Sequence, residues 1–233
     1  MTACASSGNG RGLARAAASA VTATATANIR PAMAEHGRFP PALRVVHDRS
    51  TVDLAAAERA AADFLHALGM DTTAESLRDT PRRMASAYAE LLRPSPFNLT
   101  TFPNDEGYDE LVLARAIPVH SVCEHHLLPF IGVAHVGYLP GERILGLSKL
   151  ARVVGHFARR PQVQERLTKQ IADWLTEQLQ PSGVGVVIQA EHTCMTLRGV
   201  QAAGSTTVTS TMLGTLRADG RSRAEFFTLA GLS

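Results

Sequence analysis

The sequence lacks the features that mark a secreted or membrane-spanning protein. Only three of its 233 residues are cysteines, and an odd, sparse count is not typical of an extracellular disulfide framework. No stretch reaches the roughly 18 consecutive apolar residues that a membrane span needs. The N-terminus has no compact apolar run followed by a cleavage site, so no secretory signal is predicted. We therefore expect a cytoplasmic protein.

The chain also lacks an excess of charge of either sign. Its 23 Lys and Arg nearly balance its 21 Asp and Glu, which leaves a formal net charge of +2. Nothing at the level of the whole protein therefore favours a nucleic acid or a membrane surface as partner. Any anionic ligand must be met by a local cluster of basic side chains. The hydrophobic content, 45%, is ordinary for a globular protein with a core of its own.

The first part of the chain differs in composition from the rest. Residues 1–30 contain three arginines but no acidic and no aromatic residue. Such a segment cannot bury enough surface to offset its ordering entropy, so we expect residues 1–48 to be a disordered tail. The same composition weakly fits an organelle transit peptide, and Met33 is an alternative start. Residues 49–233 are expected to form a single folded domain.

Hydrophobic periodicity predicts helices first, then strands and helices in alternating pairs. One helix begins at Leu54 and ends at Gly69, and a second has Thr80 as N-cap and Pro81 at its first position. The remaining elements are predicted as strands at 111–122 and 130–140, helices at Leu147–Ala158 and Gln162–Leu179, and strands at 183–197 and 205–216.

Two short motifs carry residues that bind transition metals. The segment CEHH places Cys123 and His126 three residues apart, so that a tight turn can aim both at one ion. In the segment EHTC, His192 and Cys194 are two residues apart and would face the same side of a strand. Cys123, His126 and Cys194 would form a Cys2His set that leaves a fourth position for water, as in catalytic zinc sites.

The remaining imidazoles of these motifs, His125 and His192, would lie within reach as proton carriers. Other interpretations remain open at this point. Cys123 and Cys194 could form a disulfide, or they could be buried thiols beside solvated histidines. A strand histidine such as His192 is also often a packing residue.

A basic helix start and one carboxylate are further candidates for substrate binding. Ser148 is predicted as an N-cap, and Lys149, Arg152 and His156 fall on the face opposite an apolar stripe that includes Leu147. Cations at a helix N-terminus are disfavoured by the helix dipole, unless an anion such as phosphate binds there. A plain solvated face is the alternative.

Arg198, a few residues past EHTC, could join this basic cluster. Glu165 lies off the buried stripe of its helix. Its carboxylate could accept the paired N–H donors of guanine, or it could simply pair with Lys169 four residues on.

The sequence resembles the GTP cyclohydrolase I family. The resemblance covers roughly residues 53–230, and it rests on the segments DTPRRM, SVCEHHLLPFIGVAHVGYLP, ILGLSKLARVV, RRPQVQERLTKQI and EHTCMTLRGV in this order. It implies an α+β tunnelling fold, in which an antiparallel four-stranded sheet carries two helices on one face and N-terminal helices precede it. It also implies a homodecamer of two fivefold rings, with active sites between subunits.

The resemblance further implies zinc-dependent hydrolysis of GTP to 7,8-dihydroneopterin triphosphate and formate, the first step of folate and pterin biosynthesis. In this interpretation Zn2+ is bound by Cys123, His126 and Cys194. Proton transfer falls to His125 and His192, and Ser148 assists the later rearrangement. The substrate would be held by Glu165 with Gln164 beside it at the guanine, and by Lys149, Arg152, Arg198 and Arg83 at the triphosphate.

Two alternatives come from different functional classes. A nitrile reductase of queuosine biosynthesis shares the fold but uses a nucleophilic cysteine and NADPH, and the Cys2His set argues against it. A non-catalytic zinc-binding paralogue would need a fourth protein ligand, which His125 or His192 could supply.

Overall fold

The four long strands form one antiparallel sheet in the order β2-β3-β6-β7. These strands are β2 (Val112–Cys123), β3 (Pro129–Leu139), β6 (Gly183–His192) and β7 (Thr207–Gly214). A two-residue strand, β5 (Pro161–Gln162), adds in parallel to β2 and was not predicted. Two further short strands, β1 (Thr101–Pro103) and β4 (Arg143–Leu145), pair with each other. The predicted four-stranded antiparallel sheet is therefore confirmed.

The structure is a computed structural model and describes residues 52–232. The predicted tail over residues 1–48 and the domain boundary at residue 49 lie outside these residues. Everything described belongs to one unit, Pro40–Ser233. Within the described part, no helix combines the length and apolarity needed to cross a membrane.

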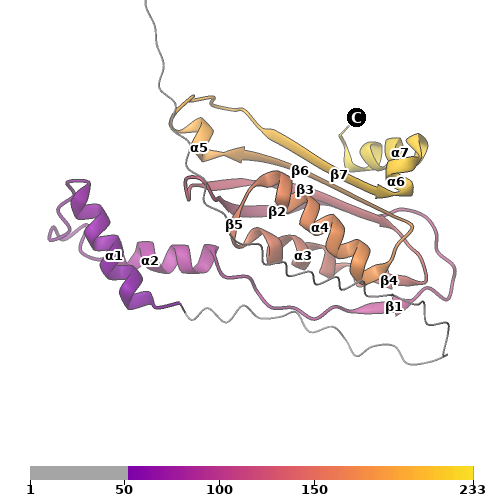
Figure 1. Ribbon diagram of the computed structural model, residues 1–233, viewed down its shortest axis with the longest axis horizontal. Helices are drawn as coiled ribbons and strands as arrows, with labels where there is room; N and C mark the ends of the chain where they lie inside the picture. The colour runs from indigo at the N-terminus through magenta and orange to yellow at the C-terminus, as the bar shows by residue number, and fades with distance from the viewer. Residues whose placement is uncertain (1–51, 233) are drawn as a thin grey trace, which may run out of the picture. The chain divides into compact units, whose positions relative to one another are not determined.

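Two helices cover one face of the sheet, as predicted (Figure 1). They are α3 (Ser148–Ala158) and α4 (Gln164–Leu179), and they pack through fully buried side chains such as Leu150 and Ile171. Alternate residues of β6 point to opposite faces, so Val186 and Ile188 belong to this core.

The opposite face of the sheet carries a second, smaller core. Val187 of β6 packs there with Phe226 of α7 (Gly220–Ala230). Helix α7 and the short α6 (Thr215–Ala218) that precedes it were not predicted. The molecule is therefore layered as helices, sheet and C-terminal helix.

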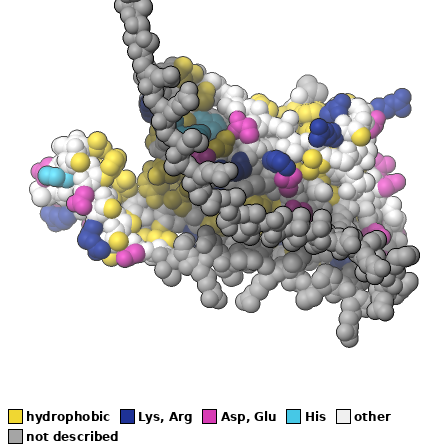
Figure 2. All heavy atoms as spheres, in the orientation of Figure 1, with side chains coloured by type: hydrophobic (Ala, Val, Ile, Leu, Met, Phe, Trp, Pro, Cys, Tyr) yellow, Lys and Arg dark blue, Asp and Glu magenta, His cyan; other side chains and the backbone are white. Residues whose placement is uncertain are grey.

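The N-terminal helices form where they were expected. They are α1 (Leu54–Ala67), capped by Asp53, and α2 (Thr80–Leu91). Thr80 is not the N-cap, because α2 begins one residue earlier than expected and Asp79 takes the cap position. Figure 2 shows acidic and basic side chains intermixed with apolar ones on the face in view, in keeping with the balanced charge.

The start of α3 also differs from the prediction. Leu147 already has helical angles, φ −52° and ψ −40°, so it is the N-cap and Ser148 is the first helical residue, without a capping bond. Leu147 is 73% exposed and is not part of the buried stripe. His156 is not solvated either, since its ring packs edge-on against Phe97 and Phe157.

The strand predicted over 183–197 ends at His192. The reason is that β3 begins at Pro129 and pairs Phe130 with His192, so β3 offers no backbone partner to later residues. The chain turns instead into the short helix α5 (Thr193–Thr196), where Thr193 Oγ1 donates to the Pro129 carbonyl at 2.6 Å. Cys194 therefore lies on a helical turn and not on a strand.

Candidate metal centre and substrate site

The two metal-binding motifs meet at one end of the sheet. Cys123 is the last residue of β2, and His192 is the last residue of β6. A tight turn follows Cys123, with its carbonyl accepting from Leu127 N at 2.8 Å and its N–H donating to Leu128 O at 2.9 Å. Leu127 takes a left-handed φ of +52° to close this turn. Figure 2 shows histidine side chains at the surface at this end, near α5.

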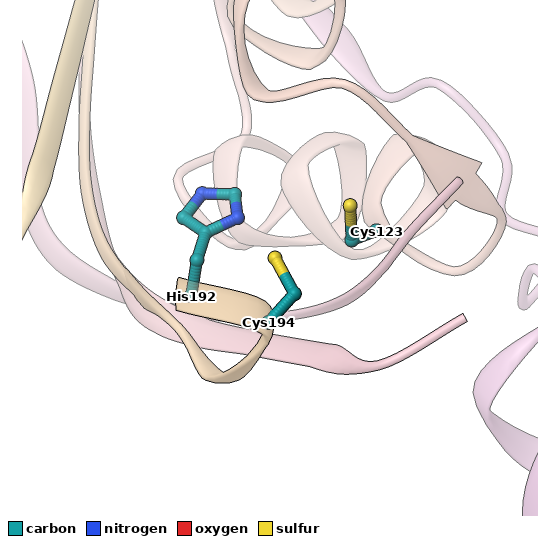
Figure 3. Close-up of side chains that lie close together, drawn as sticks. All are labelled: Cys123, His192 and Cys194. Carbon is teal, nitrogen blue, oxygen red and sulfur yellow. The ribbon is translucent and has the colours of Figure 1, made fainter. Parts of the chain in front are cut away.

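Two thiols and one imidazole come close enough to bind a single ion. One ligand atom from each of Cys123, His192 and Cys194 lies within 4.8 Å of the others. Figure 3 shows His192 and Cys194 on one segment, His192 at the end of a strand and Cys194 just after it, with Cys123 beside them on another segment. Both of these cysteines are free thiols, so the disulfide alternative is not realised.

The imidazole in this group is His192, whereas the motif spacing predicted His126 as the ligand. His126 Nδ1 lies 3.9 Å from Cys123 Sγ, and His125 Nδ1 lies 3.8 Å from it. Both histidines are exposed on the turn. The ligand role of His126 therefore stays a prediction, with its ring nitrogen next to one of the two thiols.

The surroundings of the thiols favour a bound cation. Burial raises the pKa of the Cys194 thiol, and the neighbouring Cys123 raises that pKa further. The Cys123 sulfur thus disfavours the thiolate form of Cys194, and a positive ion between the two sulfurs removes that penalty. Soft sulfur with borderline nitrogen is the donor set that suits zinc. The residues present therefore fit a zinc ion.

His192 is held from two sides. Its ring stacks on Phe130, with ring centroids 4.5 Å apart and planes inclined by 12°. Its Nε2 lies 2.7 Å from Oε1 of Gln164, a buried side chain at the start of α4. Burial lowers the pKa of His192, while the nearby Glu165 carboxylate acts in the opposite direction.

Glu165 is exposed beside this group, and its expected structural partner is engaged elsewhere. Lys169 pairs with Asp173, with Nζ 2.6 Å from Oδ2. In the described part of the chain Glu165 has no ion-pair partner, so the alternative of a Glu165–Lys169 pair is wrong. The carboxylate is thus available to a ligand.

The structure does not bring all predicted site residues together within one chain. Just before α3, the N–H of Leu145 donates to the Tyr138 hydroxyl at the far end of β3. At the last residue of α3, the Ala158 carbonyl accepts from the Ser121 hydroxyl, next to the metal group. Helix α3 therefore runs from the far end of the sheet back toward the metal group. Ser148 and Lys149, at its start, are consequently remote from Cys123.

The other basic candidates are also dispersed. Arg83 lies on α2 and pairs with Asp79, Nη2 to Oδ2 3.2 Å. Arg198 follows α5 and is exposed. It lies near enough to Cys194 for its charge to lower the pKa of that thiol, against the effect of burial. Arg152 lines a cavity of about 250 Å³ with Phe97.

Two supports of the metal turn were missed by the sequence analysis. Arg166 of α4 pairs with Glu124 and donates from Nε to Gln162 Oε1 at 3.0 Å. The hydroxyl of Tyr88 donates to the Leu127 carbonyl at 3.1 Å. The Arg166–Glu124 and Tyr88–Leu127 contacts join residues 42 and 39 positions apart, and no local sequence pattern indicates them.

The fold and the site together define a class: an α+β protein whose sheet end carries a Cys-His-Cys group suited to a metal ion, beside a free carboxylate. The model of one family, GTP cyclohydrolase I, matches residues 57–231. The chain belongs to the GTP cyclohydrolase I family.

Curated relatives agree with this placement. GTP cyclohydrolase 1 of Mycobacteroides abscessus is 52% identical over 184 residues, covering 76% of this chain and 89% of the relative. The protein of the same name from Aquifex aeolicus is 50% identical over 166 residues, covering 71% of this chain and 90% of its own. A solved archaeosine synthase QueF-Like aligns at 18% identity over 45% of this chain and 93% of its own, with a TM-score of 0.36, too slight a likeness to add to this.

Proposed function

We propose that this protein hydrolyses GTP to 7,8-dihydroneopterin triphosphate and formate, at a zinc site formed by Cys123 and Cys194. The observation that carries the proposal is the convergence of these two thiols with an imidazole, beside the unpaired carboxylate of Glu165. Family membership and relatives of about half identity support the same reaction. The product enters folate and pterin biosynthesis. Because GTP is an intracellular nucleotide, we expect the protein to act in the cytoplasm.

Zinc would be bound by Cys123, His126 and Cys194, which leaves a coordination position for water. When bound, the ion supplies a Lewis acid that lowers the pKa of a water molecule toward neutrality. His126 lies on an exposed turn, with its Nδ1 3.9 Å from Cys123 Sγ, and this nearness to one of the two thiols supports the set.

Two groups of side chains would hold the substrate. Glu165 would accept the paired N–H donors of guanine, and Gln164 precedes it on α4. Lys149, Arg152, Arg198 and Arg83 would bind the triphosphate, where backbone amides at the start of α3 add to the attraction for phosphate. Binding energy from the triphosphate would hold the reacting carbon, C8 of guanine, against the site.

Proton transfer would be divided between two histidines. His192, in its cationic form with a proton on each ring nitrogen, would deliver a proton to N7 of guanine as the five-membered ring opens. His125, exposed on the turn after β2, would protonate the ring oxygen of the ribose. Ser148 would assist the rearrangement that precedes ring closure.

The complete site would require more than one copy of the chain. Within one chain, Ser148 and Lys149 lie at the opposite end of the sheet from Cys123, so one triphosphate cannot bridge them to the same metal. A neighbouring copy would supply these groups, and β7, with one unpaired edge in the sheet, offers a place for strand pairing. We therefore infer a homo-oligomer, and the resemblance to the family implies that it is a decamer of two fivefold rings.

The direct test is incubation of the purified protein with GTP while formate and pterin fluorescence are followed. We expect both products in equal amounts, loss of both with a zinc chelator, and recovery when zinc is restored. Bound zinc without turnover would instead support a non-catalytic zinc-binding paralogue.

A further inference from the structure

The carboxamide of Gln164 occupies a buried position directly behind His192. The residue is only 2% exposed. Its Nε2 lies 3.0 Å from the Ile188 carbonyl oxygen and 3.0 Å from that of Thr207. Its Oε1 lies 2.7 Å from His192 Nε2. The side chain thus connects α4, β6 and β7 to one imidazole.

The two carbonyls fix which way this amide points. A carbonyl oxygen only accepts hydrogen bonds, so the group that faces Ile188 and Thr207 must be the NH2 of Gln164. The reverse orientation would set Oε1 against two other oxygens with no hydrogen between them. Oε1 is therefore the atom that faces His192, and as an acceptor it requires a proton on His192 Nε2.

The neighbouring hydroxyls agree with this orientation. Thr168 Oγ1 donates to the Gln164 carbonyl at 2.8 Å. The Thr209 hydroxyl, 2.6 Å from Thr168 Oγ1, then donates its own hydrogen to Thr168. Thr209 Oγ1 consequently has only lone pairs to offer Gln164 Nε2, which lies 3.1 Å away. Each hydrogen in the cluster has an acceptor.

The arrangement decides which nitrogen of His192 serves the reaction. Since Nε2 is bonded to Gln164, Nδ1 is the ring nitrogen that remains for the reaction. Figure 3 shows Nδ1, the nitrogen bonded to the ring carbon that carries Cβ, on the side of Cys194. The stacked Phe130 ring keeps the imidazole from turning out of this plane.

We propose that Gln164 is a positioning residue, whose side chain fixes the tautomer and orientation of His192 so that Nδ1 faces the substrate, and does not itself bind guanine. The proposal rests on the proposed function, because it assigns a task within the same site. It assigns the recognition of guanine by side chains to Glu165 alone.

The test compares Gln164→Met with the wild-type protein. Methionine has a similar length but cannot accept from His192, so we expect kcat to fall about 10- to 100-fold, as is typical when a partner that orients a site histidine is lost. KM should stay within about twofold, and zinc content should be unchanged, because no substrate or metal contact is removed. Equilibrium binding of GTP to the zinc-free protein should equal that of wild type.

Thr168→Val is the matched control. It removes a buried hydroxyl from the same cluster and leaves the amide-imidazole bond intact, so it should lower the melting temperature but keep kcat within about twofold. This control separates positioning from a general loss of stability.

Each remaining outcome would overturn the proposal. A Gln164→Met protein with wild-type kcat and weakened GTP binding would make Gln164 a substrate contact. Unchanged kcat and KM would mean that the bond to His192 has no role. A wild-type protein that releases no formate from GTP would overturn the proposed function as well, whereas the first two results leave that function standing.

Discussion

At the scale of single residues, the candidate site depends on a carboxylate that has no ion-pair partner among residues 52–232. Glu165 is exposed at the start of α4, while Lys169, one turn further along, is bound to Asp173. Among the described residues Glu165 has no ion-pair partner, so its carboxylate can bind a ligand and the effect of its loss is informative.

Replacing Glu165 with alanine should mainly weaken substrate binding. A hydrogen bond to a charged group contributes about 1.5–3 kcal/mol, so KM for GTP should rise by about one to two orders of magnitude. Zinc content should stay the same, because the carboxylate is not a predicted ligand. Glu177→Ala, an exposed acid on the same helix, is the control and should behave as wild type in steady-state kinetics. Normal GTP binding by Glu165→Ala would contradict the assignment.

Buried histidines outside the site should make the protein sensitive to acid. Burial lowers the pKa of His135, and the charge of Arg115 lowers it further. The unfolded chain therefore takes up a proton first as the pH falls below about 6.5, so the free energy of unfolding should decrease in that range. Burial likewise lowers the pKa of His156. Denaturant unfolding of His135→Leu between about pH 7.5 and 5.5 should show a shallower decrease than wild type. An unchanged slope would contradict this cause.

The sequence predicted much at this scale because short motifs carry the chemistry. CEHH and EHTC indicated that Cys123 and Cys194 would meet, and they do. The sequence could not indicate that His192 would be the imidazole within 4.8 Å of both thiols, because that depends on where β3 begins and β6 ends. No local pattern indicates the hydrogen bond between His192 and Gln164 of α4 either.

At the scale of elements, the sheet was predictable from alternation, and the ends of the elements were not. The four strands alternate between two cores, which is a strong local signal. Helix starts at Thr80 and Ser148 were each misplaced, because a favourable capping residue does not ensure a capping bond when the preceding residue is already helical. The end of β6 depends on its partner strand, which no single segment encodes.

Two glycines should respond in opposite ways to alanine. A Cβ on Gly132 in β3 would fall against the backbone of Gln189 and Ala190 in β6, so the strands beside the metal group must separate. Gly132→Ala should therefore cost about 3 kcal/mol. A Cβ on Gly155 in α3 meets nothing within 4 Å, so Gly155→Ala should add about 0.5–1 kcal/mol through helix propensity. Thermal and denaturant unfolding of the pair would test this, and equal effects would contradict it.

At the scale of the whole molecule, the site residues divide into two groups. One surrounds Cys123, and the other lies at the start of α3. Motif spacing predicted the first group and helix periodicity the second, but only the direction of α3 across the sheet shows that one chain keeps them apart. The assembly is thus part of the proposed catalytic apparatus.

Two impaired variants should therefore restore each other. Lys149→Glu repels the triphosphate, and Cys194→Ala removes a metal ligand, so each homo-oligomer should be nearly inactive. When the two chains are co-expressed, about a quarter of the sites at shared interfaces should receive both intact halves by random assembly, and activity should return to that extent. Mixed preparations no more active than the separate variants would show that each site lies within one chain.

Metal analysis and formate release of the Cys194→Ala protein test the central claim most directly. Cys194 is one of the two thiols on which the zinc site depends, and its loss leaves Cys123 with imidazoles alone. We predict a folded protein that has lost both its zinc and its ability to release formate from GTP. Full formate release from a zinc-free Cys194→Ala protein would contradict the account.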